Sequence, residues 1–268
     1  MTKFVLSEIF VYPIKSASGI SLKESYVGEK GLEMDRRWML IDEKGKFISQ
    51  RTHPELSLVS VNIENNGLRV KHKIINYDDL FIPFDVDEEF SIDVEIWNDK
   101  CQAVLVSNAA DCWFSKVLGI PCQLIYMPDN SVRTVDQKYS GGNKTVGFAD
   151  GFPFLLIGQS SLDDLNSKLE KPISIKRFRP NLVFKGGEPF IEDSWKEFKI
   201  ESVSFYTVKP CARCTIPTVN QETGDKGKEP LITLSSYRKK NNKVLFGQNL
   251  VHEGSGIIKV GKPLFLVK

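Results

Sequence analysis

Two cysteines three positions apart, Cys211 and Cys214, are the side chains of this sequence best suited to metal or redox chemistry. Lys209 and Arg213 flank them, and a nearby cation favours the thiolate, which is the form that binds metals. The spacing C-x-x-C fits half of a zinc site, a thioredoxin-like redox pair, or two loop cysteines without a function. A zinc site would need two more ligands, and the sequence has no second C-x-x-C and no H-x-x-x-H.

The elements on either side of the pair determine where it lies. Residues 200–208 alternate apolar and polar side chains, which predicts a strand. Pro210 has no N–H to donate to a sheet, so we expect the strand to end there and leave Cys211 and Cys214 in a tight loop. A thioredoxin-like pair normally begins a helix, whereas residues 215–219, TIPTV, favour a strand or a turn.

Three segments in order widen this pattern: PCARCTIPTVNQETG at 210–224, EPLITLSSYR at 229–238 and LFGQN at 245–249. Together they resemble the MOSC domain, which is shared by the C-terminal part of molybdenum cofactor sulfurases and by the amidoxime-reducing components. In that family the second cysteine of the pair is the protein ligand of molybdenum in a molybdopterin cofactor. The resemblance therefore implies that Cys214 is the metal ligand and the catalytic residue, and thiolate is a soft ligand suited to a sulfur-rich metal centre.

The resemblance also covers positions far from the cysteine pair. It implies that the molybdenum cofactor (Mo-molybdopterin) is bound by Lys15, Ser16, Arg36, Asp150, Gly151, Arg179, Ala212, Arg213 and Asn249. The sequence departs from the family pattern at two places, because Arg37 and Asn249 stand where the family has aromatic residues.

Each of these stretches also has an ordinary structural interpretation. Lys15 and Ser16 could hold a phosphate by charge and by hydroxyl, or lie in a solvated loop. Asp150 and the glycine after it form either a turn that a ligand can approach closely or a plain turn. Arg179, in the motif RFRPN, offers the forked guanidinium that suits phosphate, or belongs to a solvated cationic surface. Asn181 either serves the same site or caps a turn, and is not assigned.

Composition sets outer limits on the function. The 268 residues are 41% apolar and 26% charged, as in an ordinary globular protein. A net charge of +2 gives no general reason to expect nucleic-acid binding. We find no apolar run that could form a membrane segment and no signal peptide. Five cysteines do not look like a secreted disulfide framework, so we predict a cytoplasmic protein.

Short strands separated by turn signals predict a mainly β fold with a few helices, a β-rich α+β architecture. The resemblance implies an N-terminal β-barrel domain at residues 1–125 and a MOSC β-barrel domain at 126–268. The expected elements are strands at 4–12, 146–158, 182–184, 245–251 and 257–267, hairpins at 38–50 and 58–70, and helices at 108–118, 161–169 and from 230.

The resemblance implies a molybdenum-dependent reductase that converts N-hydroxylated compounds from N–OH to N–H and releases water. The sequence has no Rossmann glycine fingerprint and no flavin motif, and its three other cysteines are too few for a four-thiolate iron–sulfur cluster. We therefore expect electrons from a separate ferredoxin-, flavoprotein- or cytochrome-type protein. Two alternatives stay open: a cofactor carrier or sulfuration module without reductase activity, and a thiol-based metal-binding or redox module that uses both cysteines.

Overall fold

The computed structural model describes residues 3–89, 91–140, 142 and 144–267. The fold is mainly β, with 41% of residues in strands and 17% in helices, as predicted. Within the described ranges, the longest α-helix has 11 residues, and no helix is long and apolar enough to span a membrane.

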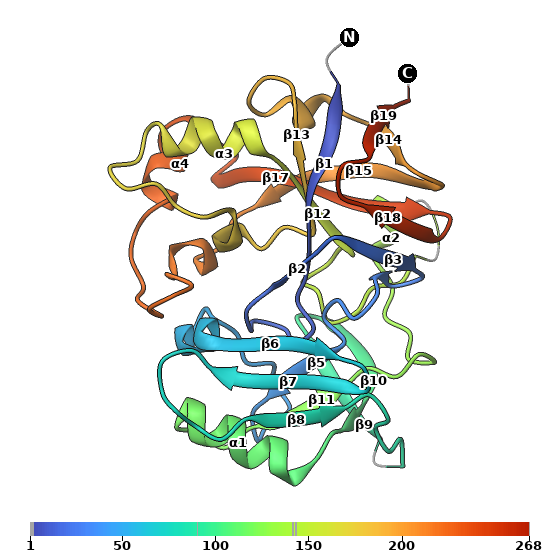
Figure 1. Ribbon diagram of the computed structural model, residues 1–268, viewed down its shortest axis with the longest axis vertical. Helices are drawn as coiled ribbons and strands as arrows, with labels where there is room; N and C mark the ends of the chain where they lie inside the picture. Colours follow the sequence, from blue (N-terminus) through green and yellow to red (C-terminus); the bar gives the residue numbers. More distant parts are fainter. Residues whose placement is uncertain (1–2, 90, 141, 143, 268) are drawn as a thin grey trace.

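A closed barrel of seven strands forms one half of the molecule, the upper half in Figure 1. The strand order is β12-β13-β1-β19-β14-β15-β17, and pairing of β12 with β17 closes the barrel. Buried phenylalanines such as Phe154, Phe198 and Phe205 fill its interior. The strands are β1 (Phe4–Val11), β12 (Phe154–Gly158), β13 (Leu182–Lys185), β14 (Glu197–Ile200), β15 (Val203–Ala212), β17 (Lys243–Glu253) and β19 (Pro263–Leu266).

The other half contains two antiparallel sheets, with their own core around Trp38, Leu68 and Phe114 (Figure 1). The first sheet has the order β5 (Trp38–Ile41), β11 (Gln123–Tyr126), β10 (Asp99–Leu105) and β9 (Ser91–Ile96), and the second the order β6 (Val59–Glu64), β7 (Gly67–His72) and β8 (Leu80–Pro83). Helix α1 (Asn108–Leu118) packs against β8 and β11.

Shorter elements complete the chain. The small strands are β2 (Ile20–Leu22), β3 (Glu24–Gly28), β4 (Gly31–Leu32), β16 (Lys239–Lys240) and β18 (Gly256–Lys259). The remaining α-helices are α2 (Gln137–Ser140), α3 (Gln159–Asn166) and α4 (Leu231–Tyr237), and the 3₁₀ helices are η1 (Pro54–Leu58), η2 (Ile175–Phe178), η3 (Ile191–Ser194) and η4 (Ile216–Thr218). Strand β3 pairs with both β4 and β18, so residues from both ends of the chain meet in this small sheet.

The first strand does not stay with the N-terminal sheets. β1 pairs antiparallel with β13 and with β19, and is thus a member of the barrel built otherwise from residues after 150. Chain segments therefore cross between the two halves, and the loop that follows β1 leads directly from the barrel to the N-terminal sheets (Figure 1). The division of the chain at residues 125/126 stays a prediction.

Candidate functional site

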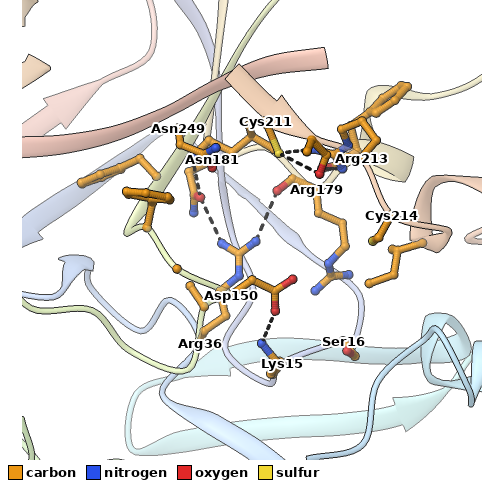
Figure 2. A pocket seen from close by; sticks show the side chains of 18 of the residues that line it. Lys15, Ser16, Arg36, Asp150, Arg179, Asn181, Cys211, Arg213, Cys214 and Asn249 are labelled. Atoms are coloured by element: carbon orange, nitrogen blue, oxygen red, sulfur yellow. Dashed lines mark hydrogen bonds and ion pairs between the residues drawn. The ribbon is translucent and has the colours of Figure 1, made fainter. Parts of the chain in front are cut away.

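One pocket of about 140 Å³ brings together all ten residues predicted for the site. They come from the loop after β1, the segment before β5, the segment before β12, the end of η2, the end of β15, and β17. The side chains labelled in Figure 2 surround a common space. The predicted residues that line the pocket are Lys15, Ser16, Arg36, Asp150, Gly151, Arg179, Ala212, Arg213, Cys214 and Asn249. Their individual roles stay predictions.

The strand that carries the cysteines is longer than predicted. β15 continues through Pro210 and ends at Ala212, so the expectation that Pro210 ends the strand was wrong. The register with β17 shifts on both sides of Pro210, and a residue without an N–H fits at such an irregularity of the ladder. Cys211 therefore belongs to the strand, while Cys214 lies in the loop between β15 and η4.

The two cysteines have different surroundings. The Sγ of Cys211 accepts a hydrogen bond of 3.1 Å from Nη1 of Arg213, and Nη2 of the same arginine donates to the carbonyl of Phe178. Figure 2 shows Cys214 apart from this pair, on another wall of the pocket. Arg213 thus contacts the first cysteine of the pair. The Nζ of Lys209 lies 4.1 Å from the ring centre of Tyr139.

Arg51 is a further cation of the pocket, and the sequence did not single it out. Burial lowers the pKa of Arg51, but the charges of Asp150 and Cys214 outweigh burial and raise this pKa above its ordinary value. Arg51 lines the same pocket and comes from the segment after β5. Because nothing in its local sequence signals a site, only the tertiary fold reveals it.

A buried lysine and two ion pairs form one side of the pocket. Lys15 is 5% exposed, and its Nζ donates to Oδ1 of Asp150 at 2.6 Å and to the carbonyl of Phe148 at 2.7 Å. Burial lowers the pKa of Lys15 to about 8, although Asp150 opposes this shift. The other carboxylate oxygen of Asp150 accepts a 2.7 Å bond from Nη2 of Arg51. The carboxylate of Asp150 is half-exposed, and the two cations hold its pKa well below its usual range.

Two arginines lie over the ring of Tyr12. The guanidinium carbons of Arg36 and Arg179 are each 4.2 Å from its ring centre. Arg36 donates to Asp35, at 2.6 Å, and to Asn181, at 3.0 Å. Arg179 donates through Nη1 to the carbonyl of Ala17, at 2.6 Å. Its buried Nη2 has no hydrogen-bond partner among the described residues, and is therefore available to an anion in the pocket.

Asn181 is the second site residue that sequence analysis left unassigned. It is 2% exposed and lines the pocket. Its Oδ1 accepts from Arg36 and from the backbone N–H of Leu155, and its Nδ2 donates to the carbonyl of Phe10. Asn181 therefore connects β1 and β12 and orients the side chain of Arg36. Its place in the RFRPN motif beside Arg179 was the available signal.

Three of the predicted site residues have a left-handed backbone. The φ angles are 72° at Ser16, 49° at Arg36 and 56° at Arg179. This conformation costs an L-residue about 1–2 kcal/mol, and such strain gathers at functional sites. The fold holds Ser16 in place through Gln50, a fully buried side chain that donates a 2.6 Å bond to the Ser16 carbonyl.

The charges of the lining suit a large anion. Five cationic side chains, those of Lys15, Arg36, Arg51, Arg179 and Arg213, face one carboxylate, that of Asp150. A Cβ added at Gly151 would meet no described atom within 4 Å, so the space beside this glycine is open. The pocket thus offers guanidinium groups for phosphate and one thiol at its wall for a soft metal.

Two family models match the chain: the MOSC N-terminal beta barrel domain at residues 3–121 and the MOSC domain at residues 143–265. The chain is 32% identical to mitochondrial amidoxime-reducing component 1 of Mus musculus, over 98% of this chain and 82% of that protein. The human protein of the same name gives the same three values. Molybdenum cofactor sulfurase of Oryza sativa subsp. japonica is 31% identical over 92% of this chain, which spans about a third, 32%, of that longer protein.

Proposed function

The chain belongs to the MOSC family, and on this premise we propose that it is a molybdenum-cofactor-dependent reductase of N-hydroxylated compounds. The reaction takes two electrons and two protons, converts N–OH to N–H, and releases water. The observation that carries the proposal is the combination, in one pocket, of the Cys214 thiol with five cationic side chains. Relatives named amidoxime-reducing component align over nearly the whole chain and support the choice of substrate class.

The residues of the pocket fit a molybdopterin cofactor. Its phosphate needs cationic donors, and the buried Nη2 of Arg179 has no partner in the described part of the chain. Lys15, Ser16, Arg36 and Arg213 line the pocket with Arg179 and complete a cationic lining for the phosphate and the pterin. Cys214 supplies the protein thiolate, and the open space beside Gly151 admits a ligand close to the backbone. When bound, the cofactor supplies the two-electron chemistry, while the protein supplies placement and electrostatics.

The side chains around this site keep its groups in fixed places. Asn181 orients Arg36 by a 3.0 Å hydrogen bond, and Asp150 holds Lys15 and Arg51 together. The apolar side chains of Phe178 and Ile216 also line the pocket. Charge pairs in such a surrounding are stronger than in bulk solvent, so the site is organised before a substrate binds.

A carrier or sulfuration module without reductase activity is the second candidate function. The observation in its favour is the 31% identity to a molybdenum cofactor sulfurase, although this chain spans only about a third of that protein. The two functions share the cofactor pocket, so binding of molybdenum does not separate them. Turnover does.

The deciding experiment is reduction of benzamidoxime to benzamidine by the purified, molybdenum-loaded protein with chemically reduced viologen as donor. We expect benzamidine to form with viologen, and no product with NADH or NADPH alone, because the sequence has neither a Rossmann fingerprint nor a flavin motif. A loaded protein that forms no benzamidine would be a carrier. Sustained NADH-driven reduction by the protein alone would contradict the separate electron-transfer partner.

A further inference from the structure

The turn between β9 and β10, in the N-terminal half, brings a tryptophan against Arg51, which lines the pocket. Trp97 has φ 59° in a two-residue turn, where glycine, asparagine or aspartate is normally preferred. Its ring lies over the guanidinium of Arg51, 4.7 Å from the ring centre, and meets Phe47 edge-on at 5.1 Å. A bulky residue in this strained backbone, with a ring still 48% exposed, indicates that the ring itself is used.

A second side chain of the same hairpin, Asp99, helps to fix Asp150, the carboxylate partner of Arg51. Asp99 accepts from Nε and Nη2 of Arg133, at 3.0 and 2.8 Å. Arg133 is 2% exposed and donates to the carbonyls of Gly147, Ala149 and Asp150. The hairpin therefore orders the backbone of Asp150 through Arg133, and orders Arg51 through Trp97.

These contacts leave one group of Arg51 free for a ligand. Nη2 is used by Asp150, at 2.7 Å, and the backbone carbonyl of Arg51 accepts a 3.1 Å bond from Lys226. Nη1 is buried and has no hydrogen-bond partner in the chain as far as it is described. A buried donor without a partner destabilises the empty pocket, and a ligand that accepts a hydrogen bond from it would recover this loss.

The charge around Arg51 favours a neutral oxygen over a phosphate. Asp150 bonds to the guanidinium of Arg51 and shares its carboxylate with Lys15, whereas Arg179 has an unpartnered buried Nη2 and no carboxylate bonded to it among the described residues. Arg51 also lines the same pocket as Cys214, the proposed metal ligand. A neutral N-hydroxyl group is the substrate feature that such a donor can bind.

We propose that Arg51 is a substrate-binding residue whose Nη1 donates a hydrogen bond to the oxygen of the N-hydroxyl group beside Cys214, and that Trp97 is the positioning residue that orients it. This inference rests on the proposed reductase function. The planar fork of arginine gives the donor a fixed direction, which lysine cannot reproduce.

The test compares Arg51→Gln, Arg51→Lys, Trp97→Gly and Trp97→Phe with the wild-type protein. Arg69→Gln is the matched control, because Arg69 also pairs with a carboxylate, Glu64, and lies over an aromatic ring, Phe81, but outside the pocket. For each protein, molybdenum and pterin content and the thermal midpoint are measured first. Equilibrium binding of benzamidoxime to the oxidised, loaded protein without reductant follows, and then KM and kcat with reduced viologen.

We expect Arg51→Gln to keep wild-type molybdenum and pterin content, and to weaken benzamidoxime binding and raise KM by about tenfold or more. Arg51→Lys should not restore binding. Trp97→Gly relieves the turn and should keep the thermal midpoint while raising KM, and Trp97→Phe should restore much of the affinity. A purely structural tryptophan would show the opposite pattern, a lower midpoint with an unchanged KM.

Two results would overturn the inference. Unchanged benzamidoxime affinity in Arg51→Gln would show that Nη1 does not bind substrate, and loss of molybdenum and pterin in this variant would make Arg51 a cofactor residue. If Arg51→Gln does not fold, the affinities of Trp97→Gly and Trp97→Phe decide the matter. Failure of the wild-type protein to reduce benzamidoxime refutes the proposed function and this inference with it, whereas an active wild type beside a normal Arg51→Gln refutes the inference alone.

Discussion

The buried ammonium of Lys15 should make anion binding to the pocket depend on pH. Burial lowers the pKa of Lys15 to about 8, so about 90% of it is charged at pH 7 and about 10% at pH 9. A bound anion favours the charged form and raises this pKa, so affinity should begin to fall as the pH rises through 8. If sulfate needs the charged lysine, its affinity should fall by up to about tenfold between pH 7 and 9.

The assay is calorimetric titration of the cofactor-free protein with sulfate, which stays a dianion over this range, at fixed ionic strength because salt screens charge. Lys15→Arg stays charged at pH 9 and should bind sulfate equally at both pH values, while Lys15→Met should bind weakly at both. Lys71→Met removes an exposed lysine paired with Asp79 and is the control. The charge of Lys15 would not control sulfate binding if the wild-type affinity were equal at pH 7 and 9. The same would hold if the affinity of Lys15→Arg fell as much as that of the wild type.

The same pKa has a consequence for stability. The folded chain holds Lys15 neutral above a pH of about 8, whereas the lysine of the unfolded chain keeps its proton up to about 10.5. The unfolded state therefore binds more protons in this window, and the contribution of Lys15 to the free energy of unfolding rises as the pH increases from 8 to 10.5. Calorimetric titration measures the affinity for sulfate separately from this effect on stability. A thermal midpoint alone would combine the two.

Three further substitutions test the site and its support. Arg179→Ala should lower molybdenum and pterin content, at a cost of about 1–3 kcal/mol in cofactor binding, and wild-type occupancy would contradict its assignment. Ser16→Gly should raise the thermal midpoint by about 1–4 °C because glycine tolerates the φ of 72°, and a lower midpoint would show that the backbone there is not strained. Arg133→Met should lower the free energy of unfolding by about 3–5 kcal/mol, because it leaves three carbonyls and Asp99 without their donor. Denaturant unfolding measures this change, and a loss below 1 kcal/mol would contradict the expectation.

Elements with local start and stop signals were predictable from the sequence. Helix α1 spans the predicted residues 108–118, because Ser107 caps its first turn and Gly119 ends it with a left-handed backbone. The hairpin of β6 and β7 is confirmed, but its turn lies at Asn65-Asn66, one residue before the predicted Asn66-Gly67, because Gly67 already pairs with Glu64. Helix caps and turn residues act over a few residues, so both elements were predictable, although the turn position was wrong by one residue.

Apolar runs were less informative. Residues 146–158 were expected to form one buried strand, but β12 covers only Phe154–Gly158. Val146 and Phe148 are buried in a loop whose carbonyls accept from Arg133 and Lys15, so the run gains burial without pairing in a sheet. The second strand predicted at 47–50 is replaced by an isolated bridge between Ile41 and Phe47. Periodicity cannot tell a buried loop from a buried strand.

The site shows the same division between local pattern and tertiary contact. Its ten predicted residues came from motifs and line one pocket. The pairing among them could not be predicted, because it depends on elements distant in the chain: Lys15 binds Asp150, 135 positions away, and Arg36 donates to the carbonyl of Arg179, 143 positions away. Arg51 escaped notice for the same reason, since its neighbours in the sequence carry no motif.

The central claim, a molybdenum cofactor bound through Cys214, is tested most directly by metal analysis and pterin fluorescence of the purified protein and its two cysteine variants. We expect molybdenum together with pterin in the wild type and in Cys211→Ser. In Cys214→Ser it predicts a reduced ratio of molybdenum to pterin, because serine is a harder and more basic ligand than thiolate. Zinc without pterin in the wild type, lost equally in Cys211→Ser and Cys214→Ser, would contradict the claim and favour a site that uses both thiols.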